Sequence, residues 1–197
     1  MRVAMPRKSI RRILRWSQAA LLAAAAGLLG YCGFVLADTW IFQRQAGRVF
    51  DRLHLQPAAL AGPGVAAMGG LVGRMEIPRL GISVAIAEGT DGATLRRAAG
   101  HIRGTALPGR SGNVGIAGHR DTLFRPLRNI REDDVITLTT LQGEYRYRVV
   151  SARIVSPSDV AVLAPDGNEI LTLVTCYPFY LVGPAPDRFI VRAERVT

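Results

Sequence analysis

The stretch I-L-T-L-V-T-C occupies residues 170–176 and joins a dense apolar segment to one of the two cysteines of the chain. Six apolar or β-branched residues in a row predict a buried strand, which Pro178 ends soon afterwards. A side chain at the end of a strand can project into a cleft while the sheet fixes its backbone. Cys176 is therefore a candidate nucleophile, and a buried structural cysteine is the alternative interpretation.

Short segments of apolar or alternating pattern recur on both sides of this stretch. We expect strands at residues 72–77, 82–86, 113–117, 134–140, 144–156, 170–175 and 189–196. We expect short helices at 94–98 and 122–129, the second interrupted at Pro126. About eight short strands with little helix predict a mainly β fold that closes into a β-barrel. Period alone does not separate a barrel from a sandwich.

The segment N-V-G-I-A-G-H-R-D at residues 113–121 ends a second apolar strand at His119. Gly115 and Gly118 are expected to leave room for close approach around the imidazole. An imidazole can protonate a departing amine and act as base in the return step. The alternative is a ring that is hydrogen-bonded to a loop carbonyl. Asp121 is a candidate to orient His119 or to cap a helix that begins at Thr122.

Arg188 opens the last predicted strand, after a loop rich in proline and aromatic residues. A guanidinium is always charged and presents fixed donors, so it can hold an oxygen that becomes negative when a thiolate attacks a carbonyl. The alternative is one more surface arginine. Together, Cys176, His119 and Arg188 supply a nucleophile, an acid/base and an oxyanion donor, which is a complete set for acyl transfer.

The remaining histidines and the second cysteine are assigned no chemistry. His101 lies in a glycine-flanked loop and is expected to be structural, and His54 is expected to be solvated. Cys176, His119 and His101 match no zinc-site spacing, so we expect no metal and no cofactor. Cys32 lies inside an apolar run, and a disulfide to Cys176 is not expected because the two belong to different parts of the molecule.

Residues 19–37 form an uncharged apolar run of nearly the length that spans a bilayer. Residues 1–18 hold six basic residues and no acidic one, which predicts a cytoplasmic N-terminus and an extracytoplasmic remainder. Three alternatives are considered. The first is a signal peptide cleaved after Ala37. The second is a lipoprotein signal ending at Cys32, which the bulky Tyr31 disfavours. The third is a buried soluble helix, which the absence of a polar face disfavours.

The chain is therefore divided into four parts: a basic cytoplasmic segment at 1–18, a transmembrane anchor at 19–37, a stalk and linker at 38–70, and a catalytic domain at 71–197. Residues 38–56 look helical, and residues 57–70 are rich in Gly, Ala and Pro. The net charge of +10 is concentrated beside the membrane segment, and residues 73–197 hold 16 arginines against 13 acidic residues. A nucleic-acid partner is not expected, because no clustered basic face with stacking aromatics is evident.

Five motifs in this order carry a resemblance to a known family: G-H-I-R-G-T-A-L-P-G at 100–109, G-N-V-G-I-A-G-H-R-D-T at 112–122, T-L-V-T-C at 172–176, Y-P-F at 177–179 and A-P-D-R-F-I-V at 185–191. They resemble the sortases, cysteine transpeptidases with a signature T-L-x-T-C and a downstream arginine. The resemblance covers about residues 72–197. The pieces around Tyr177 and Ala185 look closest to class D, with class E as the second candidate.

The resemblance implies a sortase β-barrel in which Cys176 is the nucleophile, His119 the acid/base and Arg188 the arginine that stabilises the oxyanion or positions substrate. It implies recognition of a C-terminal sorting signal of the L-P-x-T-x type on an exported protein. The acyl group would pass from the cysteine to an amine acceptor in the cell wall or a pilin. No acidic cluster corresponds to the calcium site of some class A members. A peptidase that uses water as acceptor and a non-catalytic anchored peptide-binding barrel remain open.

Overall fold

The computed structural model describes residues 7–55, 70–165 and 167–196, and it describes side chains from residue 11 onward except for residues 49–55. The chain divides into two compact units, Met1–Trp40 and Ile41–Thr197. In the second unit, the Gln43 side chain accepts a hydrogen bond from the Ala85 backbone N–H (2.9 Å) and donates one to the Arg97 carbonyl. The last turns of the first helix therefore group with the domain that follows, whereas the sequence analysis placed them in the stalk. The predicted linker at 57–70 falls outside the described residues except for Gly70.

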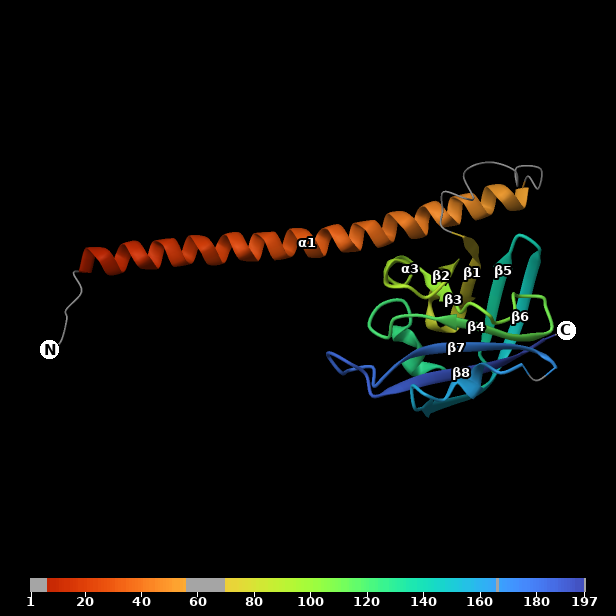
Figure 1. Cartoon of the computed structure of the whole chain (residues 1–197). Helices are drawn as coiled ribbons and strands as arrows, with labels where there is room; N and C mark the ends of the chain where they lie inside the picture. The colour runs from red at the N-terminus through yellow and green to blue at the C-terminus, as the bar shows by residue number, and fades with distance from the viewer. Residues whose placement is uncertain (1–6, 56–69, 166, 197) are drawn as a thin grey trace. The chain divides into compact units, whose positions relative to one another are not determined.

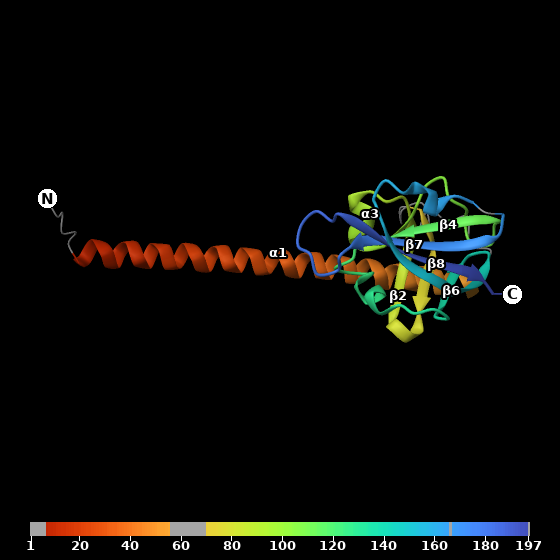
Figure 2. The same cartoon turned by 90° about the horizontal axis from the view of Figure 1, so that it is seen from below.

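Eight strands close into a barrel in the order β1-β2-β3-β4-β7-β8-β6-β5 (Figures 1 and 2). The pairs β2–β3 and β4–β7 are parallel and the others are antiparallel. The strands are β1 (Leu71–Ile77), β2 (Ile82–Glu88), β3 (Ala99–His101), β4 (Gly112–Ala117), β5 (Val135–Thr140), β6 (Gly143–Val155), β7 (Glu169–Tyr177) and β8 (Asp187–Arg195). The helices are α1 (Arg7–Leu55), α3 (Gly92–Arg97) and the 3₁₀ turns η2 (Pro78–Leu80), η3 (Arg125–Asn129) and η4 (Val160–Leu163). The predicted mainly β barrel is confirmed.

The barrel interior is filled by aliphatic and aromatic side chains from alternate positions of the strands, as a closed sheet requires. Its fully buried members include Met75, Ile86, Ile116, Leu138, Tyr147, Leu171 and Leu173. Phe124, from the segment after β4, is also fully buried. Successive side chains of a strand point to opposite faces, so the neighbours of an inward residue face outward. This alternation decides which way the candidate catalytic side chains point.

Two local predictions differ from the structure. Strand β3 is not among the predicted strands, because three residues are too short to show a period. Residues 122–129 were expected to form a helix from Thr122 interrupted at Pro126, but the ordered turn is the 3₁₀ turn η3, which starts at Arg125 and takes Pro126 into its first turn. Proline has no N–H to lose at the start of a helix, so it begins this turn and does not break it.

Helix α1 runs without a break because the sequence has no proline between Pro6 and Pro57 and is rich in Ala and Leu. Residues Arg11–Arg48 include one candidate membrane span by length and composition, and the apolar window within it has no buried residue. Leu21, Leu22, Leu28 and Leu29 are all more than 60% exposed. An apolar helix surface of this extent is typical of contact with lipid, although a signal sequence near the N-terminus has the same composition.

Asp134, just before β5, holds the turn η2 to the barrel. Its carboxylate is 7% exposed, accepts hydrogen bonds from the Arg79 guanidinium, and accepts one from the Arg131 N–H (2.8 Å). The hydrogen bonds from Arg79 lower the pKa of Asp134, while burial opposes the shift. The unfolded chain has the ordinary pKa, so this group stabilises the fold fully above that ordinary value. The contribution is lost as the pH falls through the lower pKa of the folded state.

We therefore expect Asp134→Asn to lower the melting temperature at pH 7 and to have a smaller effect at a pH below the lowered pKa of Asp134 in the folded protein, where the wild-type carboxylate is itself protonated. Thermal melts of both proteins at the two pH values measure the difference. An equal loss at both values would mean that the charge of Asp134 does not contribute.

Candidate active site

Cys176 and Arg188 are directly opposite each other on the neighbouring antiparallel strands β7 and β8. Residues that face each other across an antiparallel pair project from the same side of the sheet, with Cβ atoms about 4.5–5.5 Å apart. Both residues lie inside their strands, one residue from the strand end, because β7 continues to Tyr177 and β8 begins at Asp187. The pairing of the two strands therefore sets the thiol beside the guanidinium-bearing residue.

The two side chains point away from the barrel interior. Leu171 and Leu173 of β7 belong to the buried core, so the alternate residues Val174 and Cys176 face outward. Nearer the start of β7, the outward face is covered: the Thr172 hydroxyl donates to Asn113 Oδ1, whose own amide donates to carbonyls of the β6–β7 connection. Val174 and Cys176 lie beyond this cover and are only half-buried. The thiol therefore lies on the outer barrel wall, where a peptide can reach it.

His119 reaches the same face from the third adjacent strand. Strands β4 and β7 are parallel with Ala117 paired to Val174, so His119 and Cys176, each two residues further along its chain, lie toward the same end of the two strands. Two hydrogen bonds extend the pairing past the end of β4, from the Gly118 N–H to the Val174 carbonyl (3.1 Å) and from the Thr175 hydroxyl to the Gly118 carbonyl (2.7 Å). The three candidate residues therefore come from three neighbouring strand ends.

Gly118 is required by close packing below the histidine. A Cβ atom at Gly118 would approach the buried Phe124 ring to 2.7 Å, well inside van der Waals contact. The Phe124 N–H also donates to the His119 carbonyl (3.0 Å). The space that Gly118 leaves is therefore occupied by the Phe124 ring on the inner side of the chain. His119 is left on the outer side.

The side-chain partners of the three residues differ. The His119 ring is half-buried and makes no hydrogen bond to any described residue. Arg188 Nη1 donates to the carbonyls of Asp187 (3.0 Å) and Ala185 (3.4 Å), which ties its guanidinium to the start of β8. The remaining donors of Arg188 make no hydrogen bond to the described part of the chain. Both groups therefore have hydrogen-bonding capacity to offer a substrate.

An aromatic cluster supports this end of the barrel from the inner side. Tyr177 stacks on Phe189, and Phe179 packs edge-on against both rings, with ring centroids 5.3 to 6.4 Å apart. Tyr177 and Phe189 neighbour Cys176 and Arg188 in sequence, so their packing fixes the backbone on which the two candidate residues stand.

Among the described residues, neither His101 nor Asp121 makes a hydrogen bond to one of the three candidate residues. His101 is 3% exposed, with Nδ1 2.8 Å from Glu88 Oε2 and Nε2 2.9 Å from the Ala106 carbonyl, so the expected structural role agrees with its packing. Asp121 is exposed and makes no hydrogen bond to a described residue, so neither role considered for it is found. The side chain of His54 falls outside those that the structure describes.

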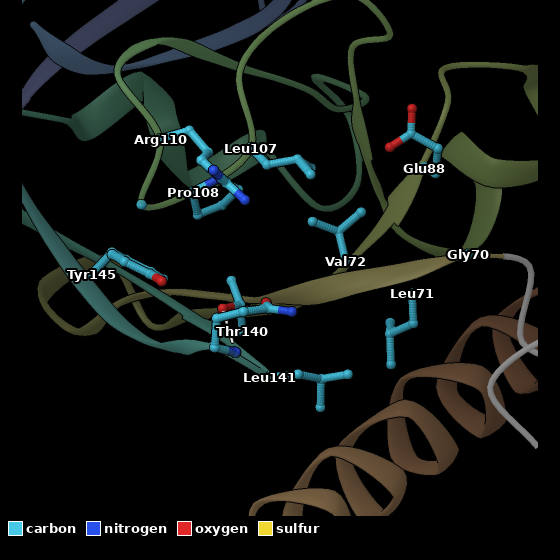
Figure 3. Close-up of a pocket in the computed structure, with 12 residues that line it drawn as sticks. Gly70, Leu71, Val72, Glu88, Leu107, Pro108, Arg110, Thr140, Leu141 and Tyr145 are labelled. Atoms are coloured by element: carbon cyan, nitrogen blue, oxygen red, sulfur yellow. Dashed lines mark hydrogen bonds between the residues drawn. The ribbon is translucent and has the colours of Figure 1, made fainter. Parts of the chain in front are cut away.

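A separate cavity of about 540 Å³ lies at the other end of the barrel (Figure 3). Its lining comes from the start of β1, the β5–β6 turn and the β3–β4 connection, with Val72, Leu107, Arg110 and Tyr145 among the labelled side chains. The start of β6 lies at the cavity and pairs with the last residue of β8, whereas Arg188 is the second residue of β8. The step of seven residues along β8 between these two positions spans roughly 20 Å, so the cavity is distinct from the Cys176 face.

Among the described residues, no group of three or more His, Cys, Asp or Glu side chains has a geometry that could hold a metal ion. One residue that sequence reasoning passed over lies directly at the site. Arg120 follows His119, is 8% exposed, and contacts the β7–β8 loop. An arginine in an arginine-rich sequence carries no signal that marks it as buried.

Comparison with known proteins agrees with this geometry. The family model described as the sortase domain matches residues 75–196. Sortase D of Bacillus subtilis (strain 168) is 32% identical over an alignment of 190 residues, which covers 90% of this chain and 96% of the relative. A sortase D5 transpeptidase of Clostridium perfringens superposes with a TM-score of 0.65 at 27% identity, covering 82% of this chain and 99% of that one.

A third similar structure is also a sortase. Sortase C of Clostridium perfringens, with its C-terminal cell wall sorting motif, superposes with a TM-score of 0.60 at 31% identity, covering 66% of this chain and 72% of that one. An eight-stranded barrel, a match over most of the barrel residues, and relatives that cover nearly the whole chain all lead to one conclusion: this chain belongs to the sortase family of cysteine transpeptidases.

Proposed function

We propose that this protein is a membrane-anchored sortase that cleaves a sorting signal of the L-P-x-T-x type on exported proteins. It transfers the resulting acyl group to an amine acceptor in the cell wall or a pilin. Cys176 is the nucleophile, His119 the general acid and base, and Arg188 the donor to the oxyanion. The observation that supports the assignment is that Cys176 and Arg188 are directly paired on β7 and β8, and that His119 follows the end of the adjacent strand β4.

The reaction follows from the three groups. The Cys176 thiolate attacks the threonine carbonyl carbon, and the carbonyl oxygen becomes an oxyanion that Arg188 stabilises by charge and hydrogen bonding. The C–N bond breaks as protonated His119 gives its proton to the leaving amine, which leaves a thioester on Cys176. The acceptor amine then attacks the thioester carbonyl and loses a proton to neutral His119. A new amide forms and the thiolate is regenerated.

Arg188→Lys should lower kcat by roughly 10²–10³-fold, the cost of losing one oxyanion donor in other acyl-transfer enzymes. Lysine keeps the positive charge but lacks the planar fork that would let Arg188 bond the carbonyls of Ala185 and Asp187 and the oxyanion together. Steady-state kinetics with a quenched fluorogenic L-P-x-T-x peptide give kcat and KM. A Lys variant with wild-type kcat would remove Arg188 from the oxyanion site.

Two other functions predict different products. A cysteine peptidase would give the same cleavage with water as acceptor, and an anchored binding barrel would give no cleavage at all. The test is to incubate the full-length protein in detergent with the L-P-x-T-x peptide, with and without a primary-amine acceptor such as triglycine, and to identify products by mass spectrometry. A transpeptidase forms the ligated peptide at the expense of the acid. Release of the acid alone, at an unchanged rate when triglycine is added, would identify a peptidase.

The proposed location has residues 1–18 in the cytoplasm and residues 38–197 outside, with the anchor retained. The basic flank before the uncharged run and the candidate span in α1 support this topology. Such an anchor would bring the enzyme to the outer face of the membrane that its exported substrates cross. Mass spectrometry of the membrane-extracted protein should detect peptides from the basic N-terminal segment. A mature chain that begins at Asp38 would refute retention of the anchor.

A further inference from the structure

Arg120 joins the histidine segment to the loop between β7 and β8. Its Nη2 donates to the carbonyls of Leu181 and Gly183, both at 2.7 Å. The loop comprises residues 178–186 and connects the strand of Cys176 to the strand of Arg188, and both views show it projecting beyond the ends of the two strands (Figures 1 and 2). One buried side chain therefore fixes the far part of the loop that borders the thiol.

The root and the tip of this loop are held by different contacts. At its root, Phe179 packs with Tyr177 and Phe189 in the aromatic cluster. Beyond the root, Tyr180 is 86% exposed and Val182 is 98% exposed. Apolar packing therefore does not hold the side chains of Tyr180 and Val182, and Arg120 supplies the side-chain hydrogen bonds to the tip among the described residues.

The Arg120 guanidinium is an unfavourable choice for stability alone. It is buried, its described hydrogen-bond partners are two neutral carbonyls, and its Nη1 is buried without a partner among the residues that the structure describes. A buried charged donor left unpaired is costly, and an apolar side chain of similar length often serves as well or better in such a position. Local choices that oppose stability are expected where function requires them.

We propose that Arg120 is a positioning residue that holds the β7–β8 loop as a wall of the peptide site and thereby sets the affinity for peptide substrate. This inference rests on the proposed function, since the loop borders the site only if Cys176 is the nucleophile. Arg120 acts through the loop carbonyls of Leu181 and Gly183 and does not take part in bond making or breaking.

The test compares Arg120→Met, Arg120→Lys and the exposed control Arg128→Met in the full-length protein carrying Cys32→Ala. For Arg120→Met, we expect KM for the fluorogenic L-P-x-T-x peptide to rise about tenfold, the equivalent of one charge-assisted hydrogen bond. We expect kcat to change less than KM and the melting temperature to stay the same or rise. Lysine can donate to both carbonyls from one nitrogen, as Nη2 does, so Arg120→Lys should recover most of the lost affinity.

Two further measurements separate positioning from a general structural role. Chymotrypsin cleavage after Tyr180, followed by mass spectrometry, should be several-fold faster in Arg120→Met than in Arg128→Met, because the loop is released. The rate at which iodoacetamide alkylates Cys176 should be unchanged. Unchanged KM and unchanged cleavage after Tyr180 would overturn the proposal, and so would an Arg120→Met protein that does not fold.

The parallel Cys176→Ala protein keeps this test separate from the proposed function. If Cys176→Ala still cleaves the peptide, then the catalytic assignment fails whatever Arg120 does. If Cys176→Ala is inactive and Arg120→Met has wild-type KM, then the assignment stands and the inference on Arg120 is wrong.

Discussion

Cys176→Ala is expected to reduce peptide cleavage and acceptor ligation to the background of the assay. A methyl group offers no lone pair to the carbonyl carbon, so no thioester can form, and loss of a nucleophile in related acyl-transfer chemistry costs on the order of 10⁴-fold or more. The fold should survive, because Cys176 is half-buried on the outer face of β7 and makes no part of the hydrophobic core. Initial rates from the fluorogenic peptide and a melting curve measure the two properties together.

The chain provides a matched control for this variant. Cys32 is the second free cysteine, and it is exposed in α1. Cys32→Ala removes the same group from a position with no proposed chemistry, so it should retain wild-type rates. Activity lost in both variants would point to damage that is general to cysteine removal, and activity retained in Cys176→Ala would remove the nucleophile from the account.

His119→Ala should reduce turnover by roughly 10²–10⁴-fold, the usual contribution of general acid–base catalysis. The variant should remain folded, because the His119 ring makes no hydrogen bond to the described residues whose loss would weaken the fold. Single-turnover acylation and the melting temperature are the two measurements. Alkylation of Cys176 by iodoacetamide shows in the same samples that the thiol remains accessible.

His101 is the natural comparison for this experiment. Its two ring nitrogens contact Glu88 and the Ala106 carbonyl in the barrel wall, so His101→Ala should lower the melting temperature and leave acylation per folded molecule intact. If instead a well-folded His101→Ala protein fails to acylate while His119→Ala is fully active, the roles of the two histidines must be exchanged.

The barrel could be predicted from the sequence because its longer strands carry period-2 or dense apolar patterns. Segments such as 144–156 and 170–175 exceed the length at which such patterns are visible. Closure into a barrel was not available from period alone, and it depends on pairings between distant strands such as β1 with β5. The three-residue strand β3 depends on its pairing with β2 and β4, which no local pattern encodes.

The candidate catalytic residues could be proposed from the sequence because each lies near the end of an apolar strand and belongs to a recognisable motif. The residues that support them in the structure could not be predicted. Arg120 has no local signal that separates it from the many other arginines, and its burial depends on the path of a loop more than 60 residues later in the chain. The hydrogen bond of Tyr147 could not be predicted either. Its buried hydroxyl donates to Glu169 (2.6 Å) at the end of the barrel away from Cys176. Burial is the larger cause that raises the pKa of the Tyr147 phenol, and the hydrogen bond to Glu169 raises it further.

The central claim is that the acyl group passes through a thioester on Cys176, and mass spectrometry of the trapped enzyme tests it most directly. The full-length protein is mixed with excess L-P-x-T-x peptide, quenched with acid within one turnover, and digested to locate the added mass. The account predicts an adduct equal to the acyl fragment on the peptide that contains Cys176, removed by hydroxylamine and absent from Cys176→Ala. An adduct on another residue, or cleavage of the peptide by Cys176→Ala, would contradict it.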